Sequence, residues 1–128
     1  MKSKYRKSLS IIMILVILVS HSIIPVSASS DYYESTYNGY SYICRSEFYP
    51  NGCVFSHMDY AGTNKIRVEI EYSYYDYLLN CSCQENAISP LKMSTTCTGA
   101  SFNEYQIGLW SNNVYTISPN MVYSVGLN

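Results

Sequence analysis

A histidine lies near a cysteine and an aspartate in residues 53–60, and these three residue types can support nucleophilic catalysis. In an extended chain, Cys53, His57 and Asp59 project from one face and nominally supply a thiol nucleophile, a general base and an orienting acid. Same-face neighbours of a strand lie about 6.6 Å apart along the chain, so Cys53 is about 13 Å from His57. Because neither spacing allows a direct hydrogen bond, we predict no catalytic residues. A thiol enzyme that uses His57 would need another cysteine brought beside it by the fold.

Two glutamates, Glu69 and Glu71, share one face of a second extended segment and resemble a catalytic carboxylate pair. A glycosidase, however, needs its carboxylates in a cleft, with one of them in apolar surroundings. Lys65 and Arg67 alternate into the same charged face, which is typical of a strand face in contact with solvent. The sequence also lacks a phosphate-binding loop and a Gly-x-Ser-x-Gly nucleophile elbow. We therefore predict a non-enzymatic protein without a cofactor.

All five cysteines follow residue 28: Cys44, Cys53, Cys81, Cys83 and Cys97. Thiols oxidise outside the cell, so we predict two disulfides that stabilise a small domain, with their pairing left open. The fifth thiol would remain free or link two chains in a disulfide-bonded dimer. Cys81 and Cys83 are two residues apart on one strand face, which is awkward for a mutual disulfide. Their spacing is also one residue shorter than a Cys-x-x-Cys zinc pair, and we predict no metal site.

Tyrosine is the unusual feature of the composition, with fifteen copies in 128 residues. A tyrosine ring has an apolar body and a polar tip, which suits recognition of proteins and of sugar rings. Strands also favour tyrosine for packing, and we assign Tyr72 and Tyr74 to the core because they continue an apolar face. Tyr75, Tyr77 and Trp110 are the residues that we predict to form an exposed binding patch.

The N-terminus is typical of an export signal. Four basic residues precede the apolar run from Ile11 to Val19, and small residues end the segment at Ala28. That run is nine residues long, whereas a membrane span needs ~20. We predict a cleaved signal peptide at residues 1–28, with a basic start typical of Gram-positive bacteria, and a secreted product without a stable membrane anchor. The exported part has four bases against nine acids, a net charge of −5, which argues against nucleic-acid binding.

The remaining chain reads as one all-β domain. The clearest signal is the strict alternation of Ile66, Val68, Ile70, Tyr72 and Tyr74 with polar residues, which indicates a half-buried antiparallel strand. Similar segments predict about seven short strands at residues 40–49, 53–60, 65–74, 91–98, 105–110, 114–117 and 121–125. We expect an antiparallel β-sandwich at residues 39–128, with immunoglobulin-like topology, after a flexible leader at residues 29–38. Closure as a barrel is left open.

These expectations favour a secreted, non-enzymatic module that binds a protein or a glycan at or outside the cell surface. Two alternatives remain open. One is a secreted effector such as a bacteriocin or toxin, and the other is the cysteine-dependent enzyme that uses His57.

Overall fold

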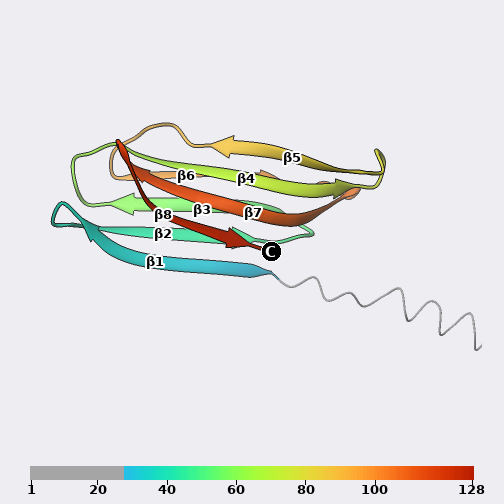
Figure 1. Cartoon of the computed structure of the whole chain (residues 1–128), viewed down its shortest axis with the longest axis horizontal. Coiled ribbons are helices and arrows are strands. Elements are labelled where there is room, and N and C mark those ends of the chain that lie inside the picture. Colours follow the sequence, from blue (N-terminus) through green and yellow to red (C-terminus); the bar gives the residue numbers. More distant parts are fainter. Residues whose placement is uncertain (1–27) are drawn as a thin grey trace, which may run out of the picture.

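The computed structural model describes residues 28–128, and this part of the chain is built of strands (Figure 1). Its elements are β1 Ser29–Tyr37, β2 Tyr40–Phe48, β3 Cys53–Tyr60, β4 Ile66–Asp76, β5 Cys81–Ile88, β6 Thr95–Ser101, β7 Gln106–Ile117 and β8 Asn120–Leu127. The predicted signal peptide, residues 1–28, lies outside the described residues except for Ala28. Within residues 28–128, no helix is long and apolar enough to cross a membrane.

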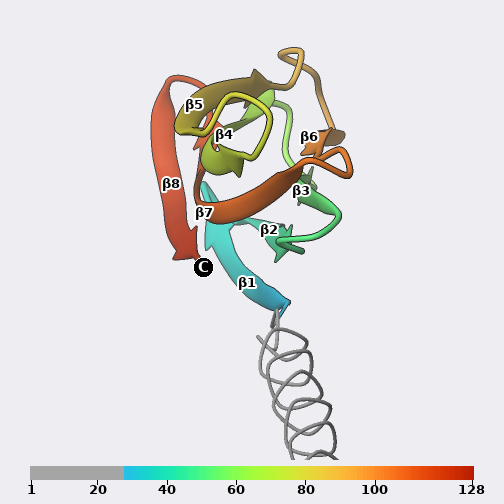
Figure 2. The ribbon, with the colours of Figure 1, turned by 90° about the vertical axis from the view of Figure 1, so that its right-hand side faces the viewer.

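The strands form two antiparallel sheets of four, which confirms the predicted all-β architecture. One sheet has the order β1-β2-β3-β6, and the other has the order β5-β4-β7-β8. Hairpins join β1 to β2, β2 to β3, β4 to β5 and β7 to β8, whereas the chain changes sheets after β3, β5 and β6. A view along the strands shows the two sheets facing each other (Figure 2). Residues that face inward from both sheets therefore form the core.

The alternation in the sequence correctly identifies the inner face of the central strand β4. In β4, all five residues from Ile66 to Tyr74 that were assigned to the core are buried. In β2, the same period of two turns Tyr42, Cys44, Ser46 and Phe48 inward. A strand places successive side chains on opposite faces, so a period of two is sufficient to assign them.

The buried apolar residues form two clusters, one near each end of the strands. The first cluster is Tyr42, Cys44, Met58, Tyr60, Ile66, Val68, Tyr115 and Ile117. The second cluster is Phe48, Val54, Ile70, Tyr72, Tyr74, Phe102 and Leu127. Both draw residues from β2, β3 and β4, so the same strands pass through the two clusters.

A layer of buried polar side chains lies between the clusters along these strands. Ser56 donates a hydrogen bond to Asn113 Oδ1 at 2.7 Å, and Asn113 Nδ2 donates to Ser111 Oγ at 3.1 Å and to the Val125 carbonyl at 3.2 Å. Ser46 contacts the Tyr115 hydroxyl, which donates to the Arg45 carbonyl at 2.7 Å. Each group buried here thus has a partner, as burial of polar atoms requires. The layer bonds the two sheets to each other.

Residues 29–38 were predicted to form a flexible leader, but Ser29–Tyr37 forms strand β1, which pairs along its length with β2. On its inner face, Tyr33 stacks on Tyr123 with ring centroids 4.0 Å apart, and Asp31 accepts a hydrogen bond from the Tyr123 hydroxyl at 2.7 Å. The outer face carries Tyr32, which is exposed. Because tyrosine occurs on both faces of this edge strand, its hydropathy does not alternate, and no strand was predicted there.

No strand was predicted between residues 74 and 91, but this segment contains strand β5, Cys81–Ile88, which pairs with β4. This edge strand buries little of its surface, so it lacks an apolar face. Glu85 instead accepts hydrogen bonds from the buried Tyr72 and Tyr74 at 2.9 and 3.0 Å. Burial, followed by this bond to Glu85, raises the pKa of Tyr72 to about 12. Backbone pairing with β4 and these polar contacts hold β5 in place. Neither kind of interaction produces a periodic pattern of apolar residues in the sequence.

Two other boundaries were also wrong. The segments at 105–110 and 114–117 form one strand, β7, because the intervening Asn113 and Ser111 are buried and hydrogen bonded instead of lying in a turn. Strand β6 begins at Thr95, whereas the predicted strand began at Leu91. Before it, Lys92 forms an isolated bridge with Ile66 of the other sheet. Two added strands and one merger give eight strands instead of about seven.

Candidate ligand-binding face

The outer face of the sheet β5-β4-β7-β8 brings three strands of polar and aromatic side chains together. Its central strand, β4, contributes the residues that alternate with the core. The register places β5 and β7 residues on either side of each of them: Ser82 and Ile107 beside Tyr75, Gln84 and Trp110 beside Ser73, Asn86 and Asn112 beside Glu71, and Ile88 and Val114 beside Glu69. We call this surface the outer face of β5-β4-β7.

A β-bulge sets the position of Trp110 on this face. Gly108 lies opposite Tyr74 and Trp110 lies opposite Ser73, so Leu109 is the extra residue of β7. The register shift falls between Ser73 and Tyr74 of β4, and the extra residue belongs to the partner strand β7. The result is that Trp110 and Tyr75, two of the three predicted binding residues, share one face.

A hollow lies in the middle of the outer face of β5-β4-β7. It has a volume of about 320 Å³ and is lined by Glu69, Glu71, Asn86, Ile88, Asn112 and Val114. Two carboxylates and two amides thus surround a space edged by two aliphatic side chains. Small-molecule sites commonly have volumes of this order and a few converging polar groups.

A second hollow adjoins the first at Asn112, which lines both. It has a volume of about 370 Å³, and its other lining residues are Trp110, Ser111, Gly126, Leu127 and Asn128. Gly126 is the β8 residue opposite Asn112, and its lack of a side chain leaves this side of the face open. Trp110 is half-buried, so part of its indole ring remains available to a ligand.

The polar groups of the first hollow keep free hydrogen-bonding capacity. Glu71 accepts a hydrogen bond from the Gln84 amide, and Glu69 lies 3.5 Å from the Arg67 guanidinium. Each carboxylate has two oxygens with several acceptor positions, so one contact leaves others open. The Asn86 and Asn112 amides form no hydrogen bond with another residue in 28–128, and each offers both a donor and an acceptor.

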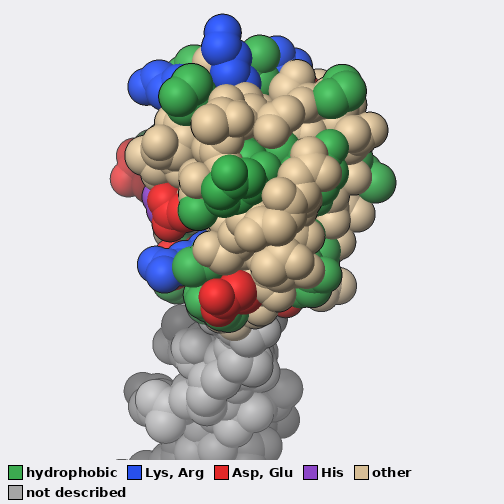
Figure 3. Space-filling view, turned by 90° about the vertical axis from the view of Figure 1, so that its left-hand side faces the viewer, with side chains coloured by type: hydrophobic (Ala, Val, Ile, Leu, Met, Phe, Trp, Pro, Cys, Tyr) green, Lys and Arg blue, Asp and Glu red, His purple; other side chains and the backbone are tan. Residues whose placement is uncertain are grey.

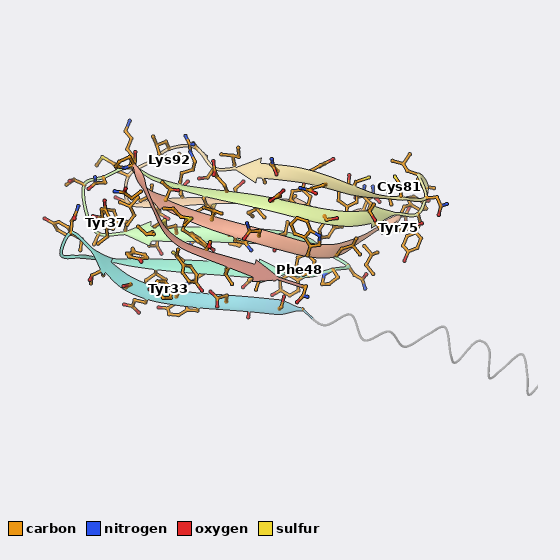
Figure 4. All side chains as sticks on the ribbon, in the orientation of Figure 1. Tyr33, Tyr37, Phe48, Tyr75, Cys81 and Lys92 are labelled. Atoms are coloured by element: carbon orange, nitrogen blue, oxygen red, sulfur yellow. The ribbon has the colours of Figure 1, made fainter. Side chains whose placement is uncertain are left out.

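The third predicted residue, Tyr77, lies just beyond the end of β4. Its ring meets that of Tyr75 edge to face, with centroids 5.1 Å apart, and Tyr77 is 62% exposed. The Tyr75 hydroxyl donates to Asn80 Oδ1 at 2.5 Å. Figure 4 shows Tyr75 at the end of the molecule where β4 turns into β5. Tyr75 and Tyr77 therefore form an aromatic corner at one end of the face.

Asp76 fixes the turn that presents Tyr77. Its Oδ1 accepts hydrogen bonds from the backbone N–H groups of Leu78 at 2.9 Å and Leu79 at 3.1 Å, and its Oδ2 accepts one from the Gln106 amide at 3.2 Å. The bond from Leu79, with those from Gln106 and Leu78, lowers the pKa of Asp76. Such an aspartate turn holds the backbone while leaving the following side chains exposed.

The face also contains residues that the sequence did not indicate. Asn86 and Ile88 fell in a predicted connection, and Asn112 fell in a predicted turn. Glu69 and Glu71 were recognised as a pair but were assigned to an open, solvated face. The placement of Ser82, Gln84, Asn86 and Ile88 at every second position was the available signal for a strand face. This signal is weak, because an alternation without a clear apolar face does not distinguish a strand from a polar loop.

His57 lies on the outer face of the other sheet, directly opposite Cys97 in the register of β3 and β6. Its Nε2 is 3.0 Å from Thr95 Oγ1 and 3.5 Å from Asp59 Oδ1, whereas its Nδ1 is buried without a hydrogen-bond partner in residues 28–128. Cys53 is four residues away along β3, as predicted. The fold thus brings a different cysteine to the strand position across from His57.

The cysteine positions do not support two disulfides. All five thiols are free in the structure. Cys44 faces the core, whereas Cys53 and Cys97 lie on the outer face of the same sheet, about four residues apart in register. A disulfide needs Cα atoms within about 7 Å, so neither Cys44–Cys97 nor Cys53–Cys97 can form. The two sulfurs in contact are those of Cys81 and Cys83, the pair that the sequence disfavoured.

The end of the molecule opposite the aromatic corner carries a different exposed surface. Figure 3 shows hydrophobic side chains gathered there, with basic side chains at one rim. Tyr40 and Met121, which lie at the β1–β2 and β7–β8 hairpins, are among the exposed apolar residues of the described chain. This surface lacks the converging polar groups of the outer face of β5-β4-β7.

Comparison with known proteins found no matching protein-family model, no similar curated protein and no similar solved structure.

Proposed function

We propose that this protein is a non-enzymatic module that acts outside the cell and binds a neutral glycan on the outer face of β5-β4-β7. The observation that carries the proposal is the joint position of Trp110 and Tyr75 beside a hollow lined by two carboxylates and two amides. The predicted export signal supports an extracellular site of action.

The chemistry of a sugar ring suits this set of side chains. Its hydroxyl groups donate and accept hydrogen bonds, and Glu71, Asn86 and Asn112 supply acceptors and donors for them. Its C–H faces pack on flat aromatic rings, for which Trp110 and the Tyr75–Tyr77 corner are available. A strip of polar groups with aromatic rings at one end favours an extended oligosaccharide over a compact ligand.

The charge of the face argues for a neutral ligand. Glu69 and Glu71 lie at its centre, and Arg67 is the basic residue next to them on β4. Phosphate, sulfate or a uronic acid would be repelled by the two carboxylates. A basic peptide would be attracted, and it is the competing ligand that the experiment below must separate.

The strand order supports the finer fold assignment that we propose, an immunoglobulin-like sandwich with one added strand. The pairs β3–β6 and β4–β7, with β8 beside β7, repeat the central pairs B–E and C–F and strand G of that fold. Strand β5 then takes the position of C′, and β1 is an addition at the edge beyond β2. Binding on the outer face of a sheet leaves this scaffold intact.

Affinity electrophoresis in gels that contain soluble neutral polysaccharides (xylan, β-glucan, galactomannan or glycol chitin) tests the proposal. We expect at least one of them to retard the protein and expect Trp110→Ala to remove the retardation by weakening binding at least tenfold. Tyr32→Ala is the matched control, because Tyr32 is an exposed aromatic residue on the other sheet. The glycan proposal would be refuted if none of the polysaccharides retards the protein. It would also be refuted if the protein binds a polylysine peptide and none of the polysaccharides.

A second candidate function is thiol-dependent catalysis at Cys97, and the observation that favours it is the position of Cys97 across from His57. Hydrolysis of a panel of activated thioesters and esters tests it. Activity that is lost in both Cys97→Ser and His57→Ala, but retained in Cys53→Ser, would establish it. Activity that all three variants retain would exclude it.

A further inference from the structure

The strands run along the long axis of the molecule, so the loops that connect them gather at its two ends (Figure 1). Residues 38–39, 61–65, 89–94 and 118–119 connect strands at one end, and residues 49–52, 77–80 and 102–105 connect them at the other. Nine of the thirteen large apolar side chains that are exposed among the described residues lie in these loops or within two residues of them. Exposed apolar surface is thus concentrated at the two ends, and such patches mark interaction sites.

The first end combines apolar side chains with positive charge. Lys65 precedes Ile66, whose backbone exchanges hydrogen bonds of 2.7 and 3.1 Å with that of Lys92, so the two exposed lysines come from neighbouring segments. The loops at this end contain no aspartate or glutamate, and neither lysine forms an ion pair within residues 28–128. Figure 3 looks at this end and shows basic side chains beside hydrophobic ones. We call it the basic end; its exposed apolar residues are Tyr40, Leu91, Met93 and Met121.

The second end combines apolar side chains with negative charge. Tyr77 donates its backbone N–H to the Tyr105 carbonyl at 2.9 Å, which holds the β4–β5 turn beside the loop before β7. Glu104 is exposed in that loop, Asp76 is the last residue of β4, and the loops at this end contain no lysine or arginine. We call it the acidic end; its exposed apolar residues are Tyr49, Tyr77, Leu78, Leu79 and Tyr105.

The turn at Leu78 and Leu79 is suited to burial against a partner. The two residues are 70% and 67% exposed, yet their backbone N–H groups already donate to Asp76 Oδ1. A surface that covers this turn therefore leaves neither N–H group unpaired, and that is the cost that opposes burial of backbone. The gain is the removal of two leucine side chains from water.

We propose that the protein associates head to tail with copies of itself, with the acidic end of one chain against the basic end of the next. The two ends have opposite charge and both are apolar, so they complement each other, whereas two like ends would repel. The ends lie at opposite poles of the long axis (Figure 1), so each contact leaves one free end on each chain and can repeat as an open row of molecules. Neither end includes the hollows of the outer face of β5-β4-β7, and the proposal is independent of glycan binding.

Sedimentation equilibrium of the exported chain, which begins at Ser29, tests the proposal in a reductant that prevents disulfides. We expect the average mass of the wild type to rise beyond that of a dimer as the concentration increases. Leu79→Asn at the acidic end and Met121→Asn at the basic end should each weaken self-association at least tenfold, because each removes a large apolar side chain from the contact.

Tyr32→Asn is the matched control and should associate like the wild type. Tyr32 is 56% exposed, close to the 64% of Met121, but it lies on the outer face of β1 and not in an end loop. Far-UV circular dichroism verifies that each variant is folded.

A mixture of the two end variants distinguishes a head-to-tail contact from other arrangements. The Leu79→Asn chain keeps an intact basic end, and the Met121→Asn chain keeps an intact acidic end. The mixture should therefore form a one-to-one dimer with the affinity of the wild-type contact, and this dimer should add no third chain. A mixture that stays monomeric would contradict the proposal.

Other results would also overturn it. A wild type that stops at a dimer, or a Met121→Asn variant that associates as well as the wild type, would show contact between like ends. A wild type that stays monomeric at every concentration would show that the ends do not bind each other. Binding of that monomer to phosphatidylglycerol vesicles would then assign the basic end to an anionic lipid surface. None of these results depends on polysaccharide binding.

Discussion

At the scale of single residues, Cys44 differs from the other thiols in its surroundings. It is 1% exposed in the first cluster, and burial, with a smaller contribution from Asp31, raises its pKa to about 12. Because the thiolate is the reactive form and Cys97 is exposed, we expect iodoacetamide at pH 8 to modify Cys97 rapidly and Cys44 only after unfolding. Peptide mass mapping, with and without denaturant, measures this difference. Equal rates for Cys44 and Cys97 in the native protein would contradict the structure.

The lowered pKa of Asp76 predicts how the free energy of unfolding depends on pH. Its pKa is lower in the folded protein than the usual value of about 3.9, so its contribution to stability is complete above that value and is lost as the pH falls below it. We expect the free energy of unfolding of the wild type to fall more steeply below pH 4 than that of Asp76→Asn, which keeps an acceptor oxygen but cannot titrate. Urea unfolding from pH 6 to pH 2.5 makes the comparison. Parallel curves would show that Asp76 does not hold the turn.

At the scale of elements, two neighbouring tyrosines test whether β1 is an ordered strand. Tyr33 stacks on Tyr123, whereas Tyr32 points to solvent. We expect Tyr33→Ala to lower the free energy of unfolding by ~1–3 kcal/mol and Tyr32→Ala to change it by less than about 0.5 kcal/mol. Chemical denaturation measures both. If residues 29–38 were a flexible leader, the two variants would behave alike.

Strand β7 offers a similar pair in Asn113 and Asn112. Asn113 is buried and hydrogen bonds to Ser56, Ser111 and the Val125 carbonyl, whereas Asn112 is exposed on the opposite face. We expect Asn113→Leu to destabilise the fold by ~1–3 kcal/mol, because it leaves buried polar groups without partners. Thermal unfolding followed by circular dichroism measures the effect. Asn112→Leu is the control. If it destabilises the fold as much as Asn113→Leu does, the buried polar layer does not depend specifically on Asn113.

At the scale of the whole molecule, the two clusters should unfold together. Strands β2, β3 and β4 contribute to both clusters, so one cluster cannot open without disturbing the strands that hold the other. We expect a single transition in calorimetry, with equal calorimetric and van't Hoff enthalpies. Val68→Ala in the first cluster and Val54→Ala in the second should each shift that one transition. Two separate transitions, each moved by one variant, would show independent halves.

The sequence by itself determined the all-β fold class and the inner face of the central strand β4. Alternation in β4 and β2 has a purely local cause, since each residue of a strand faces opposite to the last one. The same local rule identified Tyr72 and Tyr74 as core residues and Tyr77 as exposed. The gap between the predicted strands at residues 40–49 and 53–60 is a turn, in which Gly52 donates its N–H to the Tyr49 carbonyl at 2.8 Å.

The tertiary structure alone decided which strands pair and which side chains meet. Strand β1 pairs with its neighbour β2 but packs its Tyr33 on Tyr123 of the opposite sheet, and the burial of Asn113 likewise depends on Ser56 from the opposite sheet. The outer face of β5-β4-β7 likewise unites three strands whose order no local pattern encodes. The contact between Cys81 and Cys83 depends on how two side chains turn toward each other on one strand. These properties arise from contacts that the folded chain creates between side chains and strands. The periodicity of the sequence reports only how side chains alternate along a single strand.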